Sequence, residues 1–167
     1  YSSALSAPDE VLLESRGPLR ATVCVKGNLT GRDGTGFMRY VCRLSYFAGK
    51  PYVRAQVSLD NDVAQPDMNR FSSLQVRVPA ALAEATVTCG GDGKALDVPA
   101  AAGLLQDDDN HFSLGTTEGK RAEGWLLARS DERSVAVAVR DFWQRYPKGL
   151  RTDEGGVAVQ LLPPLPE

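Results

Sequence analysis

Arginine side chains recur along two neighbouring segments in which polar and apolar residues alternate. Arg39 and Arg43 lie four residues apart in the first segment, and Arg54 and Gln56 lie two apart in the second. Side chains two or four residues apart share one face of a strand, so the four would form one polar face if the segments pair in register. Guanidinium groups bind carboxylates through paired hydrogen bonds, which suits a uronic-acid polymer. The alternative is a solvated sheet face of alternating charge.

The segments that carry these side chains are predicted to form a long β-hairpin. Alternation runs through residues 37–47 and 52–59, and the intervening residues 48–51 form a short connector with Gly and Pro. Arg20 and Arg77 lie in other alternating segments and would extend the polar face from neighbouring strands.

The single histidine, His111, follows a run of acidic residues. A neighbouring carboxylate could orient the imidazole as a general base, and the alternative is an exposed loop histidine. Asp107 and Asp109 are the residues that could hold Ca²⁺, because hard cations take clustered carboxylates. The run lacks the glycine and the distal Glu of a standard calcium loop, so the alternative is a solvated acidic turn. No other cofactor is expected.

Three aromatic residues and several charges are concentrated just after a strongly alternating segment. Arg140, Trp143 and Tyr146, together with Phe142, are the residues that could present an aromatic platform to a sugar or contact another domain. The alternative is packing of the aromatic rings against the edge of the β-structure, because large aromatics dominate cores and interfaces.

Composition excludes several classes of protein. The net charge is −2 at pH 7, so no bulk field favours nucleic acid or an anionic membrane, and neither is an expected partner. No apolar run approaches the ~20 residues needed to span a bilayer. The sequence contains no phosphate loop, dinucleotide fingerprint or serine-nucleophile elbow. The glycine-rich residues 90–93 are predicted to form a hairpin turn.

Period-two alternation predicts an all-β fold, an antiparallel β-sandwich of supersandwich-like type with about nine to ten strands and minimal helix. Residues 99–119 are expected to be irregular. The three cysteines, Cys24, Cys42 and Cys89, are interpreted as buried thiols, and a bridge between Cys24 and Cys42 is left open.

The 167 residues suit a single domain, either one sandwich or two small lobes, with a core over 10–162 and a Pro-rich linker over 163–167. The first residues carry neither an initiator Met nor a signal peptide, so we expect the chain to be excised from a larger protein.

Several segments together resemble the exo-acting rhamnogalacturonan lyase family, the YetA-like proteins of polysaccharide lyase family 26. The most specific segment is Phe142-Trp143-Gln144-Arg145-Tyr146-Pro147-Lys148. The resemblance extends over about residues 10–162. The segments that carry it follow the same order as in the family and are residues 14–21, 43–54, 105–107, 123–125 and 137–148.

The resemblance implies the central β-sandwich of a lyase whose C-terminal α/α toroid carries most of the chemistry and is missing here. The parent would cleave uronate-containing pectin by β-elimination, which needs a base and a group that neutralises the carboxylate. His111 is the available histidine base, and Arg43, Arg54 or Arg140 could neutralise acid, but no family motif fixes these roles. The expected partners are other domains of the same polypeptide and an acidic glycan, in a secreted or periplasmic location. The alternatives are a stand-alone carbohydrate-binding module and a structural spacer.

Overall fold

The computed structural model describes residues 1–61, 72–82, 84–98 and 102–164. These residues form fourteen β-strands and one short 3-10 helix, η2 (Trp143–Arg145). Every strand pair is antiparallel, which confirms the predicted all-β class. The expected count of nine to ten strands was too low. No helix in the described residues is long and apolar enough to cross a bilayer.

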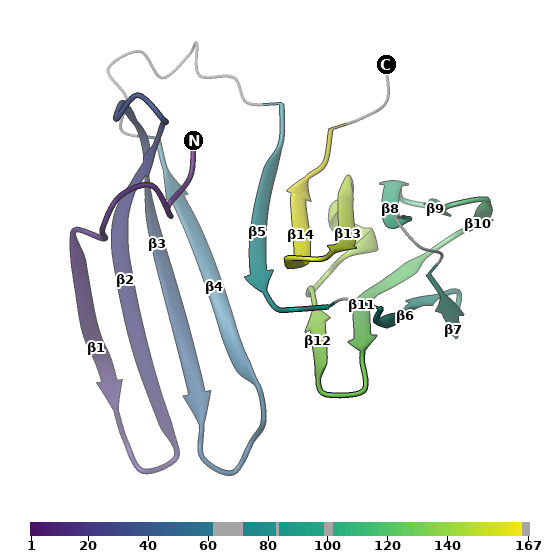
Figure 1. Cartoon of the computed structure of the whole chain (residues 1–167), viewed down its shortest axis with the longest axis horizontal. Helices are drawn as coiled ribbons and strands as arrows, with labels where there is room; N and C mark the ends of the chain where they lie inside the picture. The colour runs from purple at the N-terminus through teal and green to yellow at the C-terminus, as the bar shows by residue number, and fades with distance from the viewer. Residues whose placement is uncertain (62–71, 83, 99–101, 165–167) are drawn as a thin grey trace. The chain divides into compact units, whose positions relative to one another are not determined.

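The chain divides into two compact units, residues 1–70 and 71–167, and each is described on its own (Figure 1). The single domain expected over 1–167 stays a prediction. The last three residues of the expected linker, 165–167, lie outside the described residues.

The first unit holds one four-stranded sheet in chain order: β1 (Glu10–Arg16), β2 (Arg20–Thr30), β3 (Gly36–Phe47) and β4 (Val53–Asp60). β3 and β4 pair directly, which confirms the predicted hairpin.

Alternation gives this sheet two faces of different chemistry. One face carries polar side chains, and the other carries apolar side chains, several of which are exposed. The apolar face includes Val11, Leu13, Val23, Val25, Leu44, Tyr46, Val53 and Val57.

The second unit is a two-layered sandwich. Its six-stranded sheet has the order β10-β9-β8-β13-β14-β5, and its four-stranded sheet has the order β12-β11-β6-β7. The first sheet comprises β5 (Leu74–Pro79), β8 (Gly103–Asp108), β9 (His111–Leu114), β10 (Thr117–Gly119), β13 (Lys148–Asp153) and β14 (Gly156–Leu162). The second comprises β6 (Thr86–Gly91), β7 (Lys94–Asp97), β11 (Ala122–Arg129) and β12 (Ser134–Ala138).

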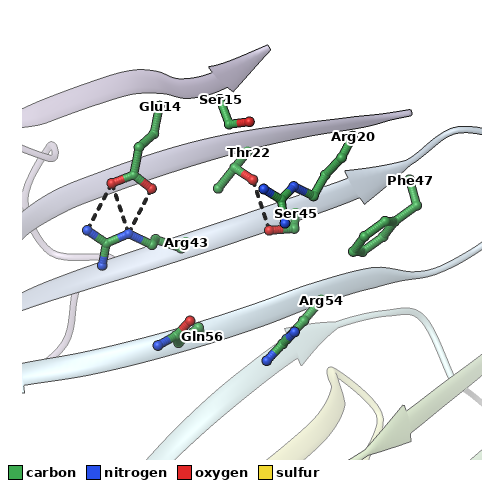
Figure 2. Close-up of a pocket in the computed structure, with 9 residues that line it drawn as sticks. All are labelled: Glu14, Ser15, Arg20, Thr22, Arg43, Ser45, Phe47, Arg54 and Gln56. Atoms are coloured by element: carbon green, nitrogen blue, oxygen red, sulfur yellow. Dashed lines mark hydrogen bonds and ion pairs between the residues drawn. The ribbon is translucent and has the colours of Figure 1, made fainter. Parts of the chain in front are cut away.

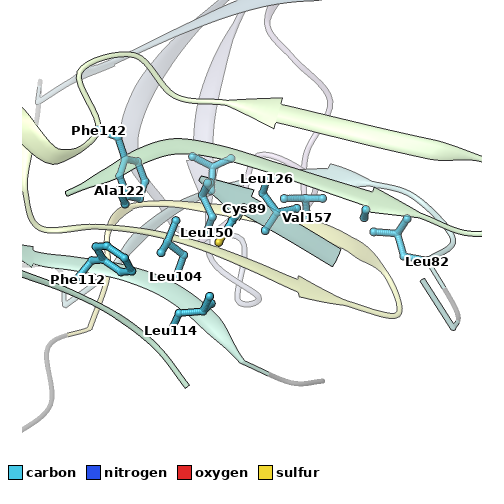
Figure 3. Close-up of a cluster of buried hydrophobic side chains, with 12 residues drawn as sticks. Leu82, Cys89, Leu104, Phe112, Leu114, Ala122, Leu126, Phe142, Leu150 and Val157 are labelled. Atoms are coloured by element: carbon cyan, nitrogen blue, oxygen red, sulfur yellow. The ribbon is translucent and has the colours of Figure 1, made fainter. Parts of the chain in front are cut away.

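The core of the second unit lies between these two sheets (Figure 3). Alternate residues of β11, including Leu126, point into the core from the four-stranded sheet. Leu104, Phe112 and Leu150 enter it from the six-stranded sheet. Phe142, just after β12, is also buried. This shared apolar layer is what a sandwich requires.

A hairpin turn was predicted over the glycine-rich residues 90–93, and it is formed by Asp92 and Gly93 between β6 and β7, whereas Gly90 and Gly91 are the last residues of β6. Asp92 and Gly93 have φ values of 51° and 74°, the left-handed conformation that a two-residue hairpin turn uses. The Asp92 carboxylate also accepts hydrogen bonds from the backbone N–H groups of Lys120 and Arg121. The turn is therefore fixed to the start of β11.

Two expectations were wrong. Residues 99–119 are not irregular, because the described part of this range contains β8, β9 and β10. These strands are only three to six residues long, so their alternation is too short to stand out. A bridge between Cys24 and Cys42 is also excluded. Cys24 lies opposite Arg43 and Cys42 lies opposite Val25, so the two thiols are on opposite faces of the sheet, and both are free.

Candidate functional site

A shallow pocket of about 240 Å³ lies on the polar face of the first unit's sheet (Figure 2). It is smaller than the pockets that take drug-sized ligands, so it suits a group of monosaccharide size. Its lining comes from all four strands and consists of Glu14, Ser15, Arg20, Thr22, Arg43, Ser45, Phe47, Arg54 and Gln56.

Strand register explains why these side chains meet. Thr22, Ser45 and Arg54 lie side by side on β2, β3 and β4. Two residues along β3, Arg43 lies opposite Gln56. Residues paired across antiparallel strands point to the same face, and rows two residues apart are separated by about 7 Å. The predicted grouping of Arg43, Arg54 and Gln56 is therefore confirmed as geometry.

The Arg43 guanidinium is bound by Glu14. The Glu14 carboxylate accepts from Arg43 Nε at 2.8 Å and from Nη2 at 2.9 Å. Hydrogen bonding to Arg43 lowers the pKa of Glu14, and the same contact raises the pKa of Arg43. Glu14 is thus a carboxylate, and Arg43 a guanidinium, at any ordinary pH.

A β-bulge places Glu14 for this contact. The pairing of β1 with β2 shifts between Leu13 and Ser15, so Glu14 is the extra residue of β1. Bulged residues leave the regular alternation, which re-aims the side chain. The carboxylate consequently reaches past β2 to Arg43 on β3 (Figure 2).

The other two arginines of the pocket have no such partner. Among the residues that the structure describes, Arg20 and Arg54 form no side-chain hydrogen bond or ion pair. Both are exposed, and they flank the hydroxyl groups of Thr22 and Ser45, which lie 3.0 Å apart. The pocket therefore presents two unpaired cations beside a pair of hydroxyls.

Two predicted members of this face do not line the pocket. Arg39 lies on the same face of β3, two rows beyond Arg43, and pairs in register with Asp60 and Asn28. Arg77 belongs to β5 in the second unit, where Asp153 holds it through contacts of 2.7 and 2.9 Å. The idea that Arg77 extends the arginine face is wrong, because its strand is in another sheet.

His111 has the carboxylate neighbour that the sequence suggested. Its Nδ1 lies 2.6 Å from Asp107 Oδ1, and hydrogen bonding to Asp107 raises the pKa of His111. A raised pKa favours the protonated imidazole, which is a poorer base at neutral pH. Asp107 is thereby hydrogen-bonded to His111. The described residues contain no group of three or more His, Cys, Asp or Glu that could hold a metal. A Ca²⁺ site on Asp107 and Asp109 stays a prediction.

The aromatic segment divides between packing and exposure. Phe142 is buried in the core, as the packing interpretation expected. The Trp143 ring carries the Arg121 guanidinium 4.1 Å above its centroid. Tyr146 is 45% exposed, and the Arg140 side chain is 85% exposed beside Asp141. A sugar-binding role for Arg140, Trp143 and Tyr146 stays a prediction.

Sequence reasoning missed Glu14, Ser15, Thr22, Ser45 and Phe47. The small hydroxyl residues carry no pattern of their own, and β1 was not predicted as a strand. The one signal for Glu14 in the sequence was its negative charge, which is opposite to that of Arg43. The bulge that directs its side chain toward Arg43 leaves no trace in the alternation of polar and apolar residues.

Comparison with known protein families found one match. Residues 106–159 match the family of the PcRGLX-like protein central beta sandwich domain, which is about a third of the chain and lies within the second unit. The match runs from β8 into β14 and confirms, for this part of the chain, the resemblance seen in the sequence. Comparisons with curated proteins and with solved structures gave no match.

Proposed function

We propose that this chain is a carbohydrate-binding β-domain of a rhamnogalacturonan-lyase-like protein. The polar pocket of the first unit holds the carboxylate of a uronate-containing glycan, and bond cleavage takes place on another part of the parent protein. Two observations support this proposal: the similarity of residues 106–159 to a central β-sandwich domain, and the unpaired arginines of the pocket.

Arg20 and Arg54 carry the argument for the ligand. An exposed guanidinium without a partner can take a carboxylate through two parallel hydrogen bonds. The Thr22 and Ser45 hydroxyls between them can donate to or accept from sugar hydroxyls. Because the pocket is open to water, each contact contributes little and the affinity should be modest and salt-dependent.

The same pocket is poorly suited to β-elimination. That reaction needs a base beside the group that neutralises the carboxylate. The pocket lining contains no His, Lys or Tyr. Its one carboxylate, on Glu14, has a lowered pKa and is engaged by Arg43, so it is a weak base. These features favour binding without cleavage.

Calorimetric titration of the chain with trigalacturonate tests the proposal. We expect binding in the micromolar to millimolar range that weakens as salt increases. Arg20→Ala and Arg54→Ala should each reduce affinity up to about fivefold, since an exposed ion pair contributes at most about 1 kcal/mol. Arg133→Ala removes an exposed arginine of the second unit that is no candidate for sugar binding and serves as the matched control.

Three results would contradict the proposal. Absence of binding would leave the structural-spacer alternative. Equal losses for Arg54→Ala and Arg133→Ala would move the site away from the pocket. Release of unsaturated uronate by the chain alone would show that it cleaves as well as binds.

A further inference from the structure

The two ends of the polar pocket differ in charge. At one end, Arg20 and Arg54 are cations that pair with none of the residues described by the structure. At the other end, Arg43 is neutralised by Glu14 and faces the uncharged amide of Gln56. A ligand that lies across the pocket therefore meets net positive charge at one end only.

The Glu14 contact leaves part of Arg43 available. Glu14 occupies the side edge of the guanidinium, formed by Nε and Nη2. Nη1 makes no hydrogen bond among the described residues. Arg43 can thus still donate to a ligand hydroxyl, and the Gln56 amide beside it can both donate and accept.

A second carboxylate placed at this end would meet the Glu14 carboxylate. Glu14 stays ionised, because Arg43 lowers its pKa, so like-charge repulsion acts throughout the working pH range. At an exposed site and ordinary salt, this repulsion offsets the attraction of Arg43, which would otherwise raise affinity about threefold to tenfold.

We propose that Glu14 is a specificity-determining residue that lets one ligand carboxylate add affinity in the pocket and cancels the gain from a second. The carboxylate lies on Arg20 and Arg54, and an uncharged, hydroxyl-bearing sugar lies against Arg43 and Gln56. This inference rests on the proposed function and adds that Glu14 makes the pocket distinguish ligands with one carboxylate from ligands with two.

The experiment compares digalacturonate with its monomethyl ester, which has one carboxylate fewer, on the wild-type chain and on Glu14→Gln. In the wild type we expect the diacid to bind no better than the monoester. Glu14→Gln should raise affinity for the diacid about threefold to tenfold and change affinity for the monoester less than twofold.

Glu10→Gln is the matched control. Glu10 lies on the same strand and forms an exposed ion pair with Lys26 at 2.7 Å, but it does not line the pocket. Equal gains for Glu14→Gln and Glu10→Gln, or no gain for either, would overturn the role of Glu14 while leaving glycan binding intact. If neither ligand binds any of the three proteins, the proposed function fails and this inference fails with it.

Discussion

Gln106 is a fully buried polar residue of the second unit. Its Nε2 donates to the carbonyl groups of Asp108 at 2.7 Å and Lys120 at 3.0 Å, and its Oε1 accepts from the Ala122 N–H at 2.8 Å. One side chain thus joins the β8–β9 turn to the start of β11. Replacing Gln106 by Leu keeps a similar volume and removes all three hydrogen bonds.

The expected decrease in the free energy of unfolding follows from the hydrogen bond that each backbone group loses. Ala122 is fully buried, so its N–H would lie unpaired in the interior, which costs about 1–3 kcal/mol. Asp108 and Lys120 are exposed residues whose carbonyl groups can regain water, so their loss costs less. We expect Gln106→Leu to lower the free energy of unfolding by about 2–4 kcal/mol, a large share of the 5–15 kcal/mol typical of a domain.

Urea unfolding followed by circular dichroism and tryptophan fluorescence measures this difference. Gln144→Leu changes an exposed glutamine on η2 and should stay within about 0.5 kcal/mol of the wild type. A value for Gln106→Leu within 1 kcal/mol of the wild type would refute the reasoning, because it would mean that the three backbone groups find other partners.

Gln106→Glu adds a pH dependence of defined sign. Burial and the two facing carbonyl groups should raise the pKa of the introduced carboxyl above its unfolded value. The folded state then favours the protonated form, so stability is retained below the unfolded pKa and lost as pH rises through the folded pKa. The variant should be less stable at pH 8 than at pH 4, relative to the wild type.

Three further predictions use other features. Gly124 has φ +77°, and a Cβ added there would collide with the buried Phe142 side chain, so Gly124→Ala should lower the free energy of unfolding by about 2 kcal/mol or more in a thermal melt. Burial raises the pKa of the Cys89 thiol to about 11, whereas Cys42 is only half-buried. A thiol reagent should therefore label Cys42 first in the native chain, and Cys42→Ser should abolish the fastest phase of the labelling reaction. Hydrogen bonding to Asp107 raises the pKa of His111, so Asp107→Asn should lower that pKa in an NMR titration of the single histidine, and an unchanged value would contradict the contact.

Long, regular strands were predictable from the sequence. The hairpin of β3 and β4 followed from uninterrupted alternation, which also placed Arg43, Arg54 and Gln56 on one face. The turn at Asp92 and Gly93 followed from residue types that accept positive φ. Both features depend on local patterns of a few residues, which the sequence displays directly.

Features set by longer-range geometry could not be predicted. β1 pairs with β2 through a bulge, and only that irregularity brings Glu14 to Arg43. β10 is three residues long, which is too short for alternation to register. Arg77 carries the same residue type as the pocket arginines, yet sheet order places it beside Asp153.

We propose above that the arginine pocket of the first unit binds a carboxylate-bearing sugar. The most direct test is NMR mapping of the isotope-labelled chain during titration with trigalacturonate and, separately, with an uncharged trisaccharide. We predict shift changes with trigalacturonate that concentrate on Thr22, Ser45, Arg54 and Gln56 and are absent with the uncharged sugar. Changes centred on Trp143 and Tyr146, or equal changes with both sugars, would contradict the account.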